Sequence, residues 1–231
     1  MPELPEVETI CRSLMPHISG RVLAGVEIHA AKLRRPLPTA AELRAVTGQR
    51  ITALERRAKY LIWHLDGGGA LIIHLGMSGQ LCFHHGPHPA ELHTHVIFHF
   101  QEGGQLHFRD PRRFGSLDLA APGELAGLPM LRGLGVEPLS PAFTAEYLCE
   151  RLEATRRAVK TVIMDQRVVV GVGNIYANEA LFQAGIHPLR PGQSLSPAEG
   201  EALQTAIVSV LGHAVERGGT TLSDYRNADG E

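Results

Sequence analysis

An α+β fold is predicted for this 231-residue chain by three features of its sequence. Helix signals stand at the N-terminus, short strand-like segments separated by turns follow them, and helical periodicity begins at about residue 131. Turns between short strands indicate a β-sandwich or β-barrel rather than alternating strand–helix units. We therefore expect an N-terminal helix and a β-rich domain over residues 1–130, followed by an α-helical domain over residues 131–231.

The N-terminal helix is indicated by Pro5 at an early helical position and by Glu6 and Glu8 in the first turn. Proline is tolerated in a first helical turn, and acidic side chains there complement the helix dipole. The apolar residues that follow have the spacing of a single helix face: Val7, Ile10, Cys11 and Leu14. This face is expected to be buried.

Six segments after Gly20 have the composition and length of short strands. They are Arg21–His29, Ile51–Leu54, Tyr60–Leu65, Ala70–Leu75, His95–Phe100 and Gln105–Phe108. The turn Glu102-Gly103-Gly104 is expected to join the last two as a hairpin. Glycine and proline become frequent between about residues 120 and 135, which places the domain boundary there.

The second half of the chain has two helix-start signals. Thr144 can cap a helix that runs to about Arg157. Ser196-Pro197-Ala198-Glu199 has the pattern of a capping box with proline at the first helical position. An apolar stripe follows this box: Leu203, Ile207, Val210, Leu211 and Ala214.

The formal net charge of −2 does not favour a nucleic-acid partner, but the basic residues are clustered. Nine of the 22 Lys and Arg residues fall in three groups: Arg56, Arg57 and Lys59; Arg109, Arg112 and Arg113; Arg156, Arg157 and Lys160. The three groups can converge on a phosphate backbone, whose charge dominates affinity for nucleic acids. On charge alone, they can equally be unrelated solvated faces.

The three cysteines are Cys11, Cys82 and Cys149, which form neither a disulfide framework nor a Cys-x-x-Cys zinc pair. The longest apolar run, near Ala70 to Leu75, is interrupted by His74 and is too short to span a bilayer. The N-terminus lacks the basic start and the apolar stretch of a signal peptide. We expect a cytoplasmic protein without a membrane partner.

Pro2 has a chemical use at the N-terminus. Removal of Met1 would leave Pro2 with a free secondary amine, and an α-amine has a pKa of about 7.7 to 8.0, so that part of it is unprotonated at neutral pH. Such an amine can attack a sugar carbon and form an iminium, and Glu3 beside it can donate a proton. If Met1 remains, the proline nitrogen is an amide and cannot attack. From the residues alone, Pro2 and Glu3 can also simply begin a helix.

Six segments in order along the chain resemble the formamidopyrimidine-DNA glycosylase family. They are Met1-Pro2-Glu3-Leu4-Pro5-Glu6-Val7-Glu8-Thr9, Arg56-Arg57-Ala58-Lys59-Tyr60-Leu61, His74-Leu75-Gly76-Met77-Ser78-Gly79, Asp110-Pro111-Arg112-Arg113-Phe114-Gly115, Gly171-Val172-Gly173-Asn174-Ile175-Tyr176-Ala177 and Gly218-Gly219-Thr220-Thr221-Leu222. The resemblance implies a bifunctional base-excision enzyme that acts on damaged double-stranded DNA as a monomer. The implied substrates are oxidised purines, and the implied activities are DNA glycosylase and AP lyase.

The resemblance also assigns catalytic roles. Pro2 would be the Schiff-base nucleophile and Glu3 the proton donor. Lys59, expected on a strand beside the N-terminus, would supply the proton for β-elimination and contact a phosphate.

Met77, Arg112 and Phe114 would form a wedge that enters the duplex when the damaged base is extruded. An apolar pair and one cation can fill the vacated space, and arginine can read the edge of the orphaned partner base by its geometry. The flanking glycines Gly76 and Gly115 favour loop tips. Alternatively, Met77 fills the core and Phe114 belongs to a sheet.

The helical domain would be a helix–two-turn–helix, with Met164–Val170 before the glycines and Tyr176–Ala184 after them. Asn174 would bind phosphate at a helix N-terminus. The resemblance implies further DNA contacts for His93, Arg156 and Lys160. A lesion-recognition loop would be formed by Gly218, Gly219, Thr220 and Thr221.

No metal site is expected, because the spacing of the 13 histidines fits no zinc pattern. Among the histidines, His95 and His99 are expected on a strand. Members of the family continue beyond the segment that corresponds to residues 227–230, with a four-cysteine zinc ribbon whose hairpin arginine grips the phosphates around the lesion. This chain has neither those cysteines nor that arginine, so no cofactor is expected. Impaired activity is predicted for a member that is truncated in this way.

Two alternatives remain at this point. One is the sister branch that removes oxidised pyrimidines, although the segment Leu4–Thr9 and the triplet Arg112-Arg113-Phe114 favour the purine branch. The other is a non-catalytic remnant that binds damaged DNA without cutting it. Borohydride trapping of a covalent adduct separates an enzyme from such a remnant.

Overall fold

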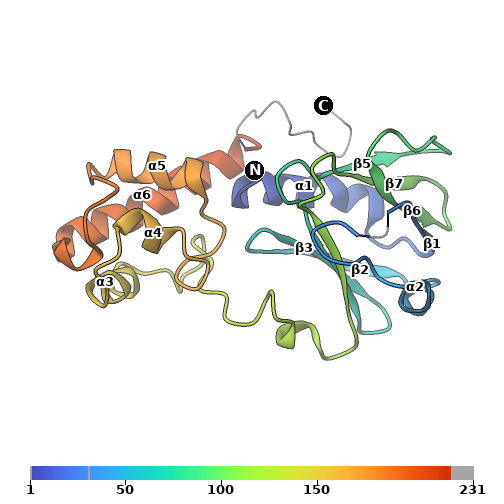
Figure 1. Ribbon diagram of the computed structural model, residues 1–231, viewed down its shortest axis with the longest axis horizontal. Coiled ribbons are helices and arrows are strands. Elements are labelled where there is room, and N and C mark those ends of the chain that lie inside the picture. Colours follow the sequence, from blue (N-terminus) through green and yellow to red (C-terminus); the bar gives the residue numbers. More distant parts are fainter. Residues whose placement is uncertain (1, 31, 220–231) are drawn as a thin grey trace. The chain divides into compact units, whose positions relative to one another are not determined.

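A computed structural model describes residues 2–30 and 32–219 of the chain (Figure 1). The described residues divide into two compact units. The β-sheet unit holds Pro2 and Glu6–Leu131, and the helical unit holds Glu3–Pro5 together with residues 132–219. The division therefore passes through the first turn of helix α1 (Leu4–Ile18).

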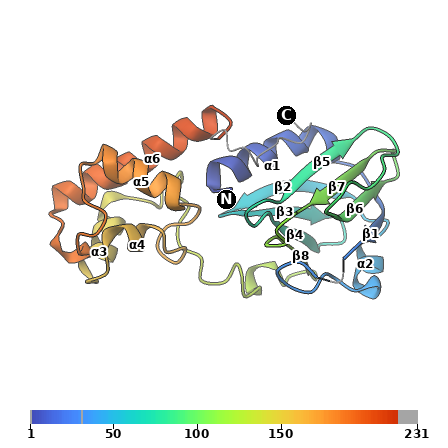
Figure 2. The same ribbon diagram turned by 45° about the horizontal axis from the view of Figure 1, so that its top comes forward.

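The β-sheet unit contains two antiparallel sheets, each with four strands among the described residues (Figure 2). One sheet has the order β1-β6-β7-β5, with bounds Leu23–Ile28, Thr94–Phe100, Gln105–Arg109 and Gln80–His84. The other has the order β2-β3-β4-β8, with bounds Ile51–Arg57, Tyr60–Leu65, Ala70–His74 and Ser116–Ala120. Helix α2 (Ala40–Val46) and the 3₁₀ turn η1 (Leu125–Gly127) complete the unit. The predicted α+β sandwich with an N-terminal helix is confirmed.

The core of this unit lies between the sheets and under α1. The rings of Trp63 on β3 and Phe98 on β6 are 4.9 Å apart at their centroids, and both side chains are fully buried. The apolar face of α1 packs into the same cluster through five of the helix's buried residues: Val7, Ile10, Cys11, Leu14 and Ile18. This face is the one that the helical spacing predicts. Burial raises the pKa of the Cys11 thiol to about 11, so this cysteine stays protonated.

The helical unit is built from α3 (Ala145–Glu153), α4 (Val159–Ile163), α5 (Asn174–Gln183), the 3₁₀ turn η2 (Gly192–Ser194) and α6 (Pro197–Glu216). Its core includes Leu203, Ile207 and Leu211 of the predicted α6 stripe. Val210 and Ala214 are only partly buried and pack against the margin of that core. The predicted helical domain is confirmed as a helix–two-turn–helix.

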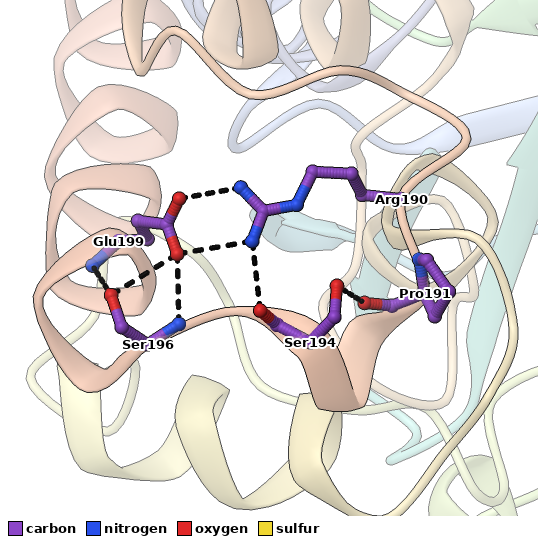
Figure 3. A network of polar contacts seen from close by, with 5 residues as sticks. All are labelled: Arg190, Pro191, Ser194, Ser196 and Glu199. Atoms are coloured by element: carbon purple, nitrogen blue, oxygen red, sulfur yellow. Dashed lines mark hydrogen bonds and ion pairs between the residues drawn. The ribbon is translucent and has the colours of Figure 1, made fainter.

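The capping box at the start of α6 is present as predicted. The Ser196 hydroxyl accepts a hydrogen bond from Glu199 N, and the Glu199 carboxylate accepts one from Ser196 N at 2.8 Å. Arg190 grips the same carboxylate with both terminal nitrogens (Figure 3). The Arg190 hydrogen bond, followed by those from Ser196, lowers the pKa of Glu199 to about 2. The box therefore stays ionised throughout the neutral range.

Three sequence predictions need correction. Helix α3 ends at Glu153 rather than at about Arg157, because the backbone carbonyls of Thr155 and Arg157 accept hydrogen bonds from residues 193 and 192. The helix before the glycines is α4, which ends before Met164, and residues 164–170 are not helical. Lys59 lies in the two-residue turn between β2 and β3 rather than on a strand.

Two strands and one α-helix of the β-sheet unit were not predicted: β5, β8 and α2. No helix among the described residues has both the length and the apolar character needed to cross a membrane.

Candidate functional site

Pro2 and Glu3 directly precede helix α1, and both are buried. The Glu3 carboxylate lies at the N-terminus of α5, inside the helical unit. Its Oε2 accepts hydrogen bonds from the backbone N–H groups of Gly173 at 2.7 Å and Tyr176 at 3.4 Å, and its Oε1 accepts one from Ile175 at 2.9 Å. These are first-turn donors that have no partner within the helix itself.

The chain is shaped to receive this carboxylate. A Cβ atom on Gly173 would overlap the Glu3 carboxyl carbon, so only glycine leaves room for the contact. The neighbouring Gly171 has φ +80°, and its carbonyl accepts the backbone N–H of Leu4 at 3.0 Å. The two glycines of the Gly-x-Gly motif therefore hold Glu3 and Leu4 in place through hydrogen bonds. Ionised carboxylate is the form that accepts three N–H groups on two oxygens, and the α5 dipole favours it further.

The predicted phosphate ligands of the helical unit lie at two places. Asn174 is the first residue of α5 and is exposed. Arg156 is exposed in the segment between α3 and α4, and Lys160 is half-buried in α4. Arg157 of the same basic cluster instead pairs with Asp165 at 2.9 Å, so this cluster is not uniformly available to a ligand.

The turn that precedes Asn174 is held by Gln166, which the sequence did not single out. Its amide nitrogen donates to the carbonyls of Met164 and Val172, and its amide oxygen accepts the N–H of Gly171 at 2.8 Å. The predicted lesion-recognition loop begins after α6 with Gly218 and Gly219, at φ +79° and +87°. Thr220 and Thr221 of that loop lie outside the described residues.

In the β-sheet unit, Lys59 is buried in the β2–β3 turn, and Arg56 holds this turn. The Arg56 guanidinium donates to the carbonyl of Ala58 at 3.0 Å and to the Glu8 carboxylate at 2.7 Å. Burial raises the pKa of Glu8, but the hydrogen bonds from Arg56 and Arg12 outweigh it, so the pKa lies below its ordinary value. Arg56 is therefore a structural member of its basic cluster.

His74, at the end of β4, is affected by the Lys59 charge. Burial, followed by the charges of Arg34 and Lys59, lowers the pKa of His74 to about 4. The imidazole is therefore neutral at physiological pH, and its Nδ1 accepts the N–H of Gly76 at 3.0 Å. Through this bond His74 fixes the beginning of the segment that carries Met77.

The three predicted wedge residues lie on two segments outside the strands. Met77 is half-buried in the turn between β4 and β5, whereas Arg112 and Phe114 are exposed between β7 and β8. The Arg112 guanidinium lies over the Phe114 ring, 5.1 Å from its centroid. Phe114 is 44% exposed, which is unusual for a large aromatic side chain beside a well-formed core. Neither Arg112 nor Phe114 belongs to a strand.

His93 has φ +72°, a conformation that is rare for a residue with a Cβ atom, and it stands just before β6. His95 and His99 lie on β6, as predicted. Other histidines gather on β5, β7 and the loop after β5, where the rings of His84 and His88 stack at 3.9 Å. Among the described residues, no group of three or more His, Cys, Asp or Glu side chains is arranged to hold a metal ion.

Comparison with known proteins covers both units. The model of the formamidopyrimidine-DNA glycosylase N-terminal domain matches residues 1–117, and the model of the formamidopyrimidine-DNA glycosylase H2TH domain matches residues 134–226. A formamidopyrimidine-DNA glycosylase of Cereibacter sphaeroides is 48% identical over 240 residues. That alignment covers the whole of this chain and 84% of the relative.

Two solved structures are similar over the full chain. The MutM (Fpg) protein of Thermus thermophilus gives a TM-score of 0.86 at 40% identity, with 83% of that protein covered. The Lactococcus lactis Fpg (MutM) in complex with DNA that contains N7-benzyl-Fapy-dG gives a TM-score of 0.91 at 30% identity, with 85% covered.

Proposed function

Because the chain belongs to the formamidopyrimidine-DNA glycosylase family, we propose that it removes oxidised purines, such as 8-oxoguanine and formamidopyrimidines, from duplex DNA and then cleaves the abasic site. The observation that carries this proposal is the N-terminal pair. Pro2 can supply a secondary amine, and Glu3 beside it is buried and fixed by three backbone N–H groups. A solved relative bound to DNA with a formamidopyrimidine-type lesion supports the substrate class.

In the proposed reaction, the lone pair of the Pro2 nitrogen attacks C1′ of the damaged nucleotide. The base departs with the electron pair of the glycosidic bond and takes up a proton. The attacking nitrogen loses its proton, the ring oxygen gains one as the sugar ring opens, and an iminium between the proline nitrogen and C1′ remains. In the β-elimination that follows, C2′ loses a proton to a base and the C3′–O bond breaks, so that the 3′ phosphate leaves; Lys59 is proposed to supply a proton in this step and to contact a phosphate. The iminium makes the adjacent C2′ proton acidic, and this is what makes the elimination feasible.

Glu3 can act in this scheme in two ways, by stabilising positive charge or by donating a proton, and its hydrogen bonds favour the first. Its observed hydrogen bonds suit the ionised carboxylate, which stabilises the positive charge that develops on the sugar and on the iminium nitrogen. Donation of a proton requires that Glu3 first takes one up against the preference of three N–H donors. Charge stabilisation is therefore the role its contacts favour in the free protein, and proton donation would follow substrate binding.

Met77, Arg112 and Phe114 are proposed to occupy the space that the extruded base leaves in the duplex. Asn174, Arg156, Lys160 and His93 are proposed to bind the backbone of the DNA. Gly218 and Gly219 are proposed to belong to the lesion-recognition loop that closes over the everted base. These assignments rest on side chains that are exposed or half-buried and on the family to which the chain belongs.

The proposal is tested by borohydride trapping on a duplex with 8-oxoguanine opposite cytosine. We expect a covalent adduct that peptide mapping assigns to Pro2, together with an intact mass that shows the loss of Met1. The matched control is the same chain with one residue retained ahead of Pro2, which turns the nucleophile into an amide and should abolish trapping. Binding without an adduct would instead identify a non-catalytic damaged-DNA-binding protein, and preferential excision of oxidised pyrimidines would identify the sister activity.

A further inference from the structure

Asp110 is a fully buried carboxylate to which the proposed reaction gives no role. It follows β7 and is 0% exposed. Its Oδ1 accepts the hydroxyl of Ser78 at 2.6 Å, and its Oδ2 accepts the N–H of Gly115 at 2.7 Å. A buried carboxylate is costly unless its oxygens are hydrogen-bonded, so this arrangement requires both partners.

The Ser78 hydroxyl joins two segments. While it donates to Asp110, it also accepts the backbone N–H of Arg112 at 3.2 Å. Ser78 belongs to the segment 75–79, which carries Met77, and Asp110 belongs to the segment 110–115, which carries Arg112 and Phe114. One hydroxyl therefore ties the backbone of the second segment to the turn of the first.

The two segments also touch backbone to backbone. A Cβ atom on Gly76 would overlap the main-chain carbonyl carbon of Phe114, and Gly76 itself has φ +65°. A Cβ atom on Gly115 would come within 2.8 Å of the carbonyl oxygen of His74. Such close approach leaves no room for one segment to move without the other.

The main chain of Asp110 adds a third segment. Its N–H donates to the carbonyl of His93 at 3.0 Å, and its carbonyl is 2.9 Å from Nε2 of the buried His95 and accepts the N–H of Arg113 at 3.2 Å. Asp110 is thus hydrogen-bonded to the segment that carries Met77, to the segment that carries Arg112 and Phe114, and to the segment that carries His93.

We propose that Asp110 and Ser78 are positioning residues that set the geometry of Met77, Arg112 and Phe114 and thereby determine which partner base the protein accepts opposite the lesion. This inference rests on the proposed function of these three side chains. Reading a base edge requires that arginine is placed to within a fraction of an ångström, and the exposed side chain of Arg112 lies over the Phe114 ring. Its backbone N–H, held by Ser78, is what fixes its position.

Ser78→Ala is the most direct test, because it removes the bridging hydroxyl and leaves the volume nearly unchanged. Ser116→Ala is the matched control: Ser116 is also a buried serine, and its hydroxyl accepts a hydrogen bond from Arg35 rather than joining the two segments. Thermal unfolding of both variants measures any general loss of stability.

Wedge insertion is measured without chemistry on a duplex that contains a tetrahydrofuran abasic analogue, with 2-aminopurine as the neighbour of the orphaned cytosine. The unaltered chain should raise the fluorescence as the wedge unstacks this probe. Ser78→Ala should reduce the amplitude at saturation while Ser116→Ala preserves it. An unchanged amplitude in Ser78→Ala, or no response with the unaltered chain, overturns the inference.

Base selection is measured as the ratio of single-turnover excision rates for 8-oxoguanine opposite cytosine and opposite adenine. Loss of a hydrogen bond to a charged group should reduce this ratio about tenfold in Ser78→Ala, and less in Asp110→Asn. Lysis of an abasic site in single-stranded DNA, which has no partner base, should stay within about twofold. Equal losses for both partner bases overturn the inference. If the unaltered chain inserts its wedge but excises nothing, the proposed enzyme function fails, and the fluorescence assay still decides on the role of Asp110 and Ser78.

Discussion

Each unit holds a carboxylate that is buried against backbone N–H groups, but these two carboxylates, Asp110 and Glu3, differ in the partners available to them. Asp110 of the β-sheet unit shares its oxygens between the N–H of Gly115 and the hydroxyl of Ser78. Glu3 of the helical unit accepts hydrogen bonds from three main-chain N–H groups, which lie 170 or more residues away in the sequence. A hydroxyl can rotate and become an acceptor, whereas a backbone N–H remains a donor. Loss of charge should therefore be tolerated better at Asp110 than at Glu3.

The largest effect is expected from Glu3→Gln. An amide in place of the carboxylate points an NH₂ group at backbone donors, which should lower the free energy of unfolding by about 2 to 3 kcal/mol. Excision should fall at least about 100-fold, since the charge proposed to assist the reaction is lost. Chemical denaturation and single-turnover kinetics measure the two effects.

Asp110→Asn is the matched substitution in the other unit. Rotation of the Ser78 hydroxyl lets the amide donate to it, so the expected loss is only about 1 kcal/mol. Equal losses of stability in Glu3→Gln and Asp110→Asn would remove the distinction between the two carboxylates.

The second prediction tests the close approach of the wedge segments. Gly76→Ala combines a positive φ with overlap against the main chain at Phe114, and should cost about 2 to 4 kcal/mol. Gly103→Ala is the control, because Gly103 has φ +85° but open space around its Cβ position, and should cost about 1 kcal/mol. Similar losses in the two variants would mean that the segments separate easily, which contradicts their tight packing.

The third prediction concerns pH and the start of the Met77 segment. The folded-state pKa of His74 is lowered from 6.5 to about 4, so the unfolded chain takes up a proton first as the pH falls. The stability that depends on neutral His74 is present above pH 6.5 and is lost between about pH 6.5 and pH 4, by at most about 3 kcal/mol. His74→Asn keeps an acceptor for Gly76 and cannot titrate, so its stability relative to the unaltered chain should rise over that interval.

Urea denaturation at several pH values measures this difference. A constant difference between the two chains from pH 7 to pH 4 would show that His74 is protonated as readily in the folded state as in the unfolded state.

The elements that the sequence predicted are those whose apolar pattern is complete within one segment. The single apolar face of α1 and the capping box of α6 are local signals, and both were found. The alternation of buried Leu81 and Phe83 with outward Cys82 and His84 was an equally local signal for β5. This strand pattern runs directly into His84-His85-Gly86-Pro87-His88, a glycine- and proline-containing segment whose composition is typical of a loop. The capping box of Thr39 and Glu42 was likewise a local signal for the start of α2.

The contacts of the candidate site are of another kind. The family resemblance of the sequence motifs assigns roles to Pro2, Glu3 and Lys59. No spacing in the sequence, however, indicates that the Glu3 side chain caps α5. Asp110 stands in a recognised motif, yet its partner Ser78 is 32 residues away and belongs to a different motif. Such pairs depend on how strands are ordered in a sheet, and period and propensity do not specify that order.

The smallest effect is expected at the capping box of α6. Ser196→Ala removes the acceptor for Glu199 N and should cost about 1 kcal/mol. Ser194→Ala is the control, because the Ser194 hydroxyl bonds only a turn carbonyl, that of Pro191, and its loss should cost less than about 0.5 kcal/mol. Arg190 holds Glu199 in place in both variants, so the carboxylate continues to accept Ser196 N (Figure 3). A loss in Ser196→Ala as large as that in Glu3→Gln would mean that helix starts in this unit depend on their caps alone, and that burial of the Glu3 charge adds nothing to the stability of α5.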